Sequence, residues 1–153
     1  MSFTKPIGVA YLDQDIDGGI IGATNPQFMR GTTVYATEEL GYCSCAFGEV
    51  TQLTSKSTAV TLNTPTGRIT MNDASLGNNT TVVFRMNNST IKTNDVLILN
   101  ISGGVASAGN YLAYVADIGT GYGDIALANR KGGGGALSEA VKITFSTIHN
   151  RDD

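Results

Sequence analysis

Few residues of this chain have the types and spacing needed for chemistry, and the most suggestive group is acidic. Residues 13–18 (Asp-Gln-Asp-Ile-Asp-Gly) place carboxylates at alternate positions and a glycine sixth, as the start of a calcium loop does. Thr24 occupies the twelfth position, where such a loop has a bidentate glutamate, and no helix is expected on either side. We therefore interpret the segment as a solvated acidic turn and expect no metal or cofactor.

Two other candidates for chemistry also have simpler interpretations. His149 is the only histidine and is followed by Asn-Arg-Asp-Asp, so we expect an exposed tail residue rather than a general base. Lys131 precedes a run of four glycines, whereas the lysine of a phosphate-binding loop follows them, so we expect a flexible turn. The sequence therefore predicts that the chain is not an enzyme.

Composition excludes further classes of partner. Charged residues make up 15% of the 153 residues, against about 25% in a typical domain, and the net charge is −3. We expect no nucleic-acid binding, because the ten lysines and arginines are scattered along the chain. No apolar run reaches about 18 residues and the N-terminus does not resemble a secretory signal. We expect no membrane partner and synthesis in the cytoplasm.

The two cysteines, Cys43 and Cys45, lie one residue apart. In an extended strand they would point to the same face, and a disulfide closing so short a loop would be strained. We therefore expect both to be small buried hydrophobic residues.

From Val50 onward, short runs rich in Val, Ile, Thr and Phe alternate with Gly, Asn, Ser and Asp turns. Such runs predict strands, and no segment predicts a helix that could connect parallel strands. The expected strands cover residues 50–54, 57–62, 67–71, 80–86, 95–101, 110–118, 124–129 and 139–148.

Two of these runs carry a clear burial pattern. In residues 80–86, Val82, Phe84 and Met86 share one face while Val83 and Arg85 share the other, which predicts a strand covered on one face. The nearly unbroken apolar run 95–101 predicts a central strand. Seven or eight short strands without helices predict an all-β fold, an antiparallel β-sandwich over residues 49–150. Jelly-roll and immunoglobulin-like topologies both remain open.

Residues 1–48 form an N-terminal arm without a sustained hydrophobic period, apart from one possible helical turn at residues 36–40. The arm is too apolar and aromatic for a free tail, so we expect it to be extended and ordered by contact with a neighbouring subunit. The residues expected to make this contact are Tyr11, Ile20, Ile21, Phe28 and Tyr35.

Three strings of the sandwich region resemble a module of tailed-bacteriophage virion proteins. They are VTQLTSKSTAVTLNTPTGRITMNDASL, TVVFRMNNSTIKTNDVLILNISGG and LSEAVKITFSTI, and the resemblance spans about two-thirds of the chain, from Val50 to Ile148. The resemblance implies a structural protein found among small head proteins and some tail-fibre proteins. It carries over no catalytic residues.

The short arm and the lack of a repetitive shaft make the chain similar to a capsid decoration, or cement, protein. That similarity implies a place on the outer capsid surface of the virion, with the major capsid protein and other copies of this chain, as a homodimer or homotrimer, as partners. The alternative is a tail-fibre component with a module that binds host glycans, for which Tyr111, Tyr114 and Tyr122 are candidate stacking residues.

Overall fold

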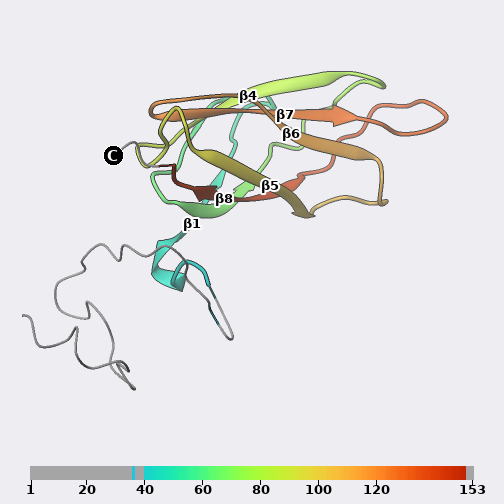
Figure 1. The fold of residues 1–153 in the computed structure, drawn as a ribbon. Coiled ribbons are helices and arrows are strands. Elements are labelled where there is room, and N and C mark those ends of the chain that lie inside the picture. The colour runs from blue at the N-terminus through green and yellow to red at the C-terminus, as the bar shows by residue number, and fades with distance from the viewer. Residues whose placement is uncertain (1–35, 37–39, 151–153) are drawn as a thin grey trace, which may run out of the picture. The chain divides into compact units, whose positions relative to one another are not determined.

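The computed structural model describes residue 36 and residues 40–150, and these residues form a β-sandwich (Figure 1). The unit that holds the sandwich begins at Leu40. One 3-10 turn, η2 (Ser44–Ala46), precedes the strands. The strands are β1 (Phe47–Thr51), β2 (Val60–Thr61), β3 (Thr66–Thr70), β4 (Thr81–Asn87), β5 (Val96–Gly103), β6 (Tyr111–Gly119), β7 (Tyr122–Asn129) and β8 (Lys142–Ile148).

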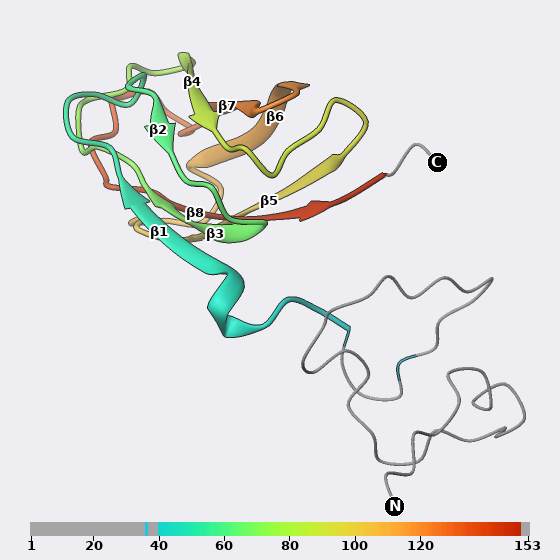
Figure 2. The same cartoon turned by 90° about the vertical axis from the view of Figure 1, so that its left-hand side faces the viewer.

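The strands form two four-stranded sheets, ordered β1-β3-β8-β5 and β2-β4-β7-β6. Figure 2 shows the two sheets as separate layers, with β1, β3, β8 and β5 in one layer and the other four strands above them. Each of the eight expected runs overlaps one of these strands, so the prediction of an all-β sandwich is confirmed. The first strand begins at Phe47, two residues before the expected start of the sandwich.

The sheets are mixed rather than wholly antiparallel, which corrects one detail of the prediction. Four of the six strand pairs are antiparallel, but β1 with β3 and β2 with β4 are parallel. Parallel strands need a crossover connection, and the prediction assumed that only a helix could supply it. Here the chain alternates between the sheets from β1 to β4, so β2 serves as the crossover between β1 and β3.

The core lies between the sheets and follows the alternation along each strand. In β4, Phe84 and Met86 are buried while Val83 and Arg85 are exposed, so the predicted half-covered strand is confirmed. Ile125 and Leu127 of β7 are fully buried in the same layer. From the facing sheet, Ile69, Ile143 and Phe145 complete the centre of the core. Burying each such side chain contributes about 1.5–3 kcal/mol.

The prediction that the apolar run 95–101 is a central strand is wrong. The strand β5 lies at the edge of its sheet and pairs only with β8. Leu97 is buried, but Val96 and Ile98 point away from the core and are each 49% exposed. The inference from an unbroken apolar run assumes that the same chain covers both faces of the strand. Among the described residues, none buries Val96 and Ile98 on the outer face of β5.

Candidate interaction surface

Groups that could do chemistry are dispersed over the described part of the chain. No three His, Cys, Asp or Glu side chains there lie close enough to hold a metal ion. The acidic segment 13–18 lies outside the described residues. Lys131 stands in a loop in which Gly133, Gly134 and Gly135 have positive φ, and no helix follows it. The expected turn is therefore present, and it has no helix N-terminus to bind a phosphate.

His149 is paired rather than free. Its Nδ1 lies 2.8 Å from Oδ2 of Asp95, whose side chain is fully buried, and 36% of the histidine side chain is exposed. Asp95 also accepts hydrogen bonds from the amides of Lys92 at 2.8 Å and Asn150 at 3.0 Å. Burial raises the pKa of Asp95, but these hydrogen bonds outweigh burial and hold the pKa below its usual value. We call the four residues the Asp95 clamp, because they hold the residues after β8 to the loop before β5.

A second polar cluster is buried near the start of β6. The Tyr111 hydroxyl donates to Oε2 of Glu139 at 2.5 Å, and burial together with this carboxylate raises the pKa of Tyr111. The ammonium of Lys56 donates to the backbone oxygens of Asn72 at 2.5 Å and Glu139 at 2.7 Å. Desolvation lowers the pKa of Lys56 despite the carboxylates of Asp73 and Glu139. The buried Lys56 ammonium and Tyr111 hydroxyl therefore both have hydrogen-bond acceptors within the cluster, and we assign the cluster a role in stability rather than in a reaction.

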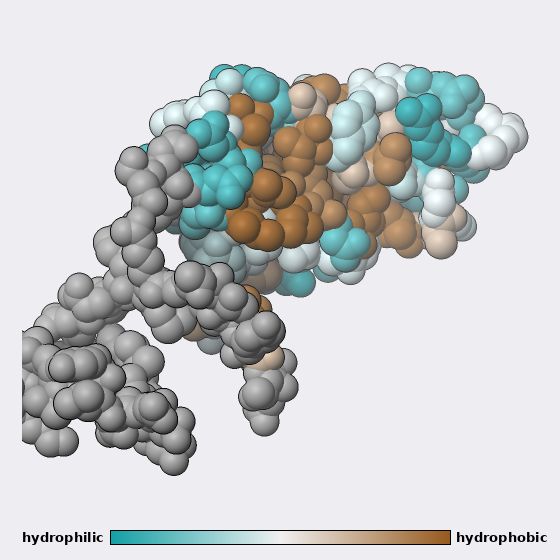
Figure 3. Space-filling view, in the orientation of Figure 1, coloured by the Kyte–Doolittle hydropathy of each residue, from teal (hydrophilic) through white to brown (hydrophobic). Residues whose placement is uncertain are grey.

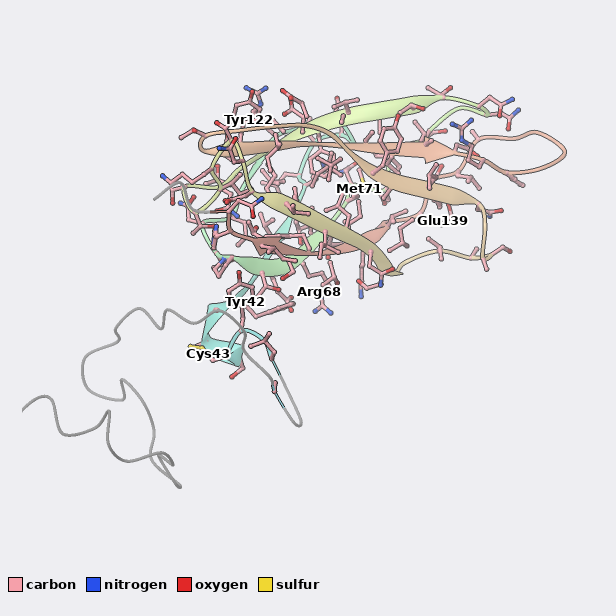
Figure 4. The ribbon with its side chains drawn as sticks, in the orientation of Figure 1. Tyr42, Cys43, Arg68, Met71, Tyr122 and Glu139 are labelled. Atoms are coloured by element: carbon pink, nitrogen blue, oxygen red, sulfur yellow. A yellow bond between two sulfur atoms is a disulfide. The ribbon has the colours of Figure 1, made fainter. Side chains whose placement is uncertain are left out.

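The three tyrosines named for glycan stacking do not share one platform. Tyr111 is buried and bonded to Glu139, and Figure 4 places Glu139 and Tyr122 at opposite ends of the sandwich. The ring of Tyr122 lies beneath the guanidinium of Arg85, 3.9 Å from its centre, and Arg85 also makes a bidentate ion pair with Asp124. Tyr114 is 43% exposed. A single free aromatic face therefore remains among the three.

Among the described residues, four of the ten exposed large hydrophobic side chains border one side of the sandwich. This side lies between the edge strands β5 and β6, which are in front in Figure 1. Figure 3 has the same orientation and shows a broad hydrophobic area there. We call it the open side. On the outer faces of the two bordering strands, four apolar side chains are each between 43% and 49% exposed: Val96 and Ile98 of β5 and Leu112 and Tyr114 of β6.

The core itself reaches the surface on the open side. Leu99 and Ile101 of β5 and Ala113 and Val115 of β6 pack against the core but are only partly buried. They face the space between the sheets, and no described strand connects the two edges there. Neither residues 96–103 nor residues 111–116 include a charged side chain. Apolar and uncharged area of this kind is typical of an interaction site.

The opposite side of the sandwich, between β1 and β2, is closed by contrast. Leu62 lies between the sheets against two glycines, and a Cβ atom would come within 2.6 Å of its side chain at Gly48 and within 2.9 Å at Gly67. On the neighbouring strands β1 and β3, Glu49 and Arg68 form an ion pair at 2.5 Å. Packing and charge thus protect this side from association.

The segment before β1 corrects the prediction for the cysteines. Cys43 and Cys45 are exposed and joined by a disulfide, and Figure 4 shows Cys43 beside Tyr42 ahead of the sandwich. The prediction assumed an extended chain, but the turn at η2 brings the two Cα atoms to 5.3 Å, within the usual disulfide range. The Tyr42 hydroxyl donates to the carbonyl of Thr147, which ties this segment to β8.

Sequence reasoning placed the contact residues in the arm and missed those of the open side. Tyr11, Ile20, Ile21, Phe28 and Tyr35 lie outside the described residues, as do residues 37–39 of the expected helical turn. The signal for the open side was the strand β6, in which alternate positions on both faces are apolar from Tyr111 to Ala116. A strand that is apolar on both faces but lies at an edge must expose one of them.

Comparisons with known proteins identify no relative. No family model, no curated protein and no solved structure matches the chain. Among the described residues, no helix is both long and apolar enough to cross a bilayer.

Proposed function

We propose that this chain is a structural protein of a tailed-bacteriophage virion, of the capsid decoration type. In this role it binds the outer shell, associates with other copies of itself and stabilises the major capsid protein. The resemblance of residues 50–148 to a phage virion module supports the proposal. The observation that carries it is the open side, a sizeable uncharged apolar surface on a sandwich whose described polar clusters are satisfied internally.

Low charge density supports the same role for a physical reason. A shell repeats each subunit many times, so each surface charge is repeated at short intervals and neighbouring copies repel one another. A chain with 15% charged residues limits this repulsion. Stabilisation then comes from apolar burial and strand-edge hydrogen bonds summed over many copies.

The arm supplies the contact with the shell in this proposal. Tyr11, Ile20, Ile21, Phe28 and Tyr35 would become buried against capsid subunits, while the sandwich remains outside. The test is deletion of residues 1–35, followed by co-sedimentation with particles that lack the protein. We expect the truncated chain to keep its thermal midpoint, because the described strands begin at Phe47 and the core residues follow it, and to lose binding to particles. Unchanged occupancy of the capsid after the deletion would contradict shell binding through the arm.

Cryo-electron microscopy of the parent particle tests the location directly. Density for the sandwich on the outer shell, with the arm laid across capsid subunits, is the expected result. Density at the tail or its fibres alone would contradict the decoration role and favour the tail-fibre alternative. A glycan array on the purified chain provides the matched test of that alternative, with Tyr114→Ala as the variant that should abolish any signal from stacking.

A further inference from the structure

Four strands form the edges of the two sheets, and three of them carry a feature that opposes pairing with another chain. The edge strand β1 carries the charged Glu49, which pairs with Arg68. The strand β2 is only two residues long. The strand β6 has a register shift between Val115 and Asp117, and Asp117 adds a charge. Charges, short length and bulges are the usual means by which proteins protect sheet edges.

The fourth edge, β5, has little such protection. Residues 96–101 pair with β8 in unbroken register, and the irregularity comes only between Ile101 and Gly103. The strand has no charged residue and no proline. Val96 and Ile98 expose 49% of their surface beside this edge, and Leu99 and Ile101 are only partly buried on its inner face. An edge of this length and polarity is a template for pairing with another strand.

We propose that β5 of one copy pairs antiparallel with β5 of a second copy about a two-fold axis. The result is one continuous eight-stranded sheet, ordered β1-β3-β8-β5 in each copy and joined at the two β5 edges. With the axis near the middle of the strand, the Ile98 side chains of the two copies lie close together on the outer face and the Leu99 side chains lie close together on the inner face. This inference rests on the proposed function, because it names the surface by which a decoration protein of this kind associates with itself.

Charge and symmetry favour a second copy as the occupant. Each chain carries a net charge of −3, and the repulsion between two copies is weakest where they meet through an uncharged surface, because salt screens charges that lie more than about 10 Å apart. The β5 edge is such a surface, whereas a charged partner would find no complementary group on it. Antiparallel pairing of a strand with itself also matches donors to acceptors automatically, and a two-fold interface of this kind is the commonest in oligomers.

The test is sedimentation velocity of the full chain and of charge-introducing variants. We expect the wild-type chain to sediment as a dimer and Ile98→Lys to sediment as a monomer with half the mass. Val83→Lys is the matched control, since Val83 is 48% exposed on the inner strand β4 of the other sheet, and this variant should remain dimeric. Val96→Lys is a second variant on β5, and thermal melts establish that each protein is folded.

Several outcomes would overturn the pairing. The wild-type chain could stay monomeric up to millimolar concentration or sediment as a trimer, or the Ile98→Lys variant could remain dimeric. Dissociation by Val83→Lys but not by the β5 variants would place the interface on the other sheet instead. A monomer that still binds particles would refute this inference alone. A β5-dependent dimer that is absent from the virion would refute the proposed function and leave the pairing intact.

Discussion

Replacing Asp95 by asparagine tests whether one buried carboxylate holds the residues after β8 to the loop before β5. In the Asp95 clamp, Oδ2 accepts from the Lys92 amide and contacts His149 at 2.8 Å each, and Oδ1 accepts from the Asn150 amide at 3.0 Å. Asparagine has the same shape but only one acceptor oxygen. Its amide nitrogen would face at least one of these donors, so a buried N–H would lose its partner.

The expected loss follows from these contacts. A hydrogen bond to a charged acceptor contributes about 1.5–3 kcal/mol, and the cost of burying the carboxylate offsets part of the sum over three bonds. We expect Asp95→Asn to lower the free energy of unfolding by about 3 kcal/mol at pH 7, in the range for breaking one side of a buried polar network.

The same contacts predict a pH dependence. Burial acts to raise the pKa of Asp95, but the hydrogen bonds outweigh it, so the folded-state pKa lies below the unfolded value of 3.8. A lowered folded-state pKa means that the stabilisation is fully present above pH 3.8 and is lost as the pH falls through the folded-state pKa. The difference in the free energy of unfolding between wild type and Asp95→Asn should therefore be present above about pH 4 and narrow as the pH falls below that.

Urea denaturation followed by circular dichroism, repeated across this pH range, measures both effects. The matched control is Asp117→Asn, because Asp117 is an exposed carboxylate that accepts one hydrogen bond, from the Tyr122 hydroxyl at 3.2 Å. Its denaturation midpoint should stay that of the wild type. The reasoning fails if Asp95→Asn also keeps the wild-type midpoint at pH 7, or if its deficit persists undiminished in acid.

Two further predictions concern single positions of the fold. Gly104 and Gly109 both have positive φ, +71° and +83°, but a Cβ at Gly104 would lie 2.0 Å from the carbonyl oxygen of Ala140 whereas Gly109 has open space. Gly104→Ala should cost more than about 3 kcal/mol and Gly109→Ala about 1 kcal/mol in urea denaturation, and equal losses would refute the contact. The Thr147 hydroxyl is buried without a partner among the described residues, so Thr147→Val should raise the free energy of unfolding by about 1 kcal/mol. A lower thermal midpoint for that variant would contradict this.

Local pattern predicted the strands well because burial on a strand has a period of two. The run 80–86 overlaps β4 and the run 139–148 contains β8, with alternate side chains buried as expected. Pairing between strands depends on contacts far apart in the sequence, which no local pattern contains. The parallel pair of β1 and β3 is an example, since it depends on the crossover through β2 in the facing sheet.

The candidate surface was less predictable than the fold. The pair of Asp95 and His149 joins residues 54 positions apart, and neither has a sequence neighbour that signals the other. For β5 the signal was present, but it was interpreted under the assumption that an apolar strand is covered on both faces by its own chain. The structure leaves Val96 and Ile98 exposed, so that assumption fails at this strand.

That failure is itself informative about association. An uncharged apolar edge strand exposes unpaired backbone groups and apolar side chains together, a combination that folded monomers normally avoid. The chain protects its other edges with the Glu49–Arg68 pair, the short β2 and the shift before Asp117, so the physical means of protection are present in the same molecule. Their near absence from β5 supports our proposal that a second copy covers this edge. Because covering it needs neither charge nor a specific side-chain contact, an identical strand is the simplest structure that satisfies both its backbone and its apolar faces.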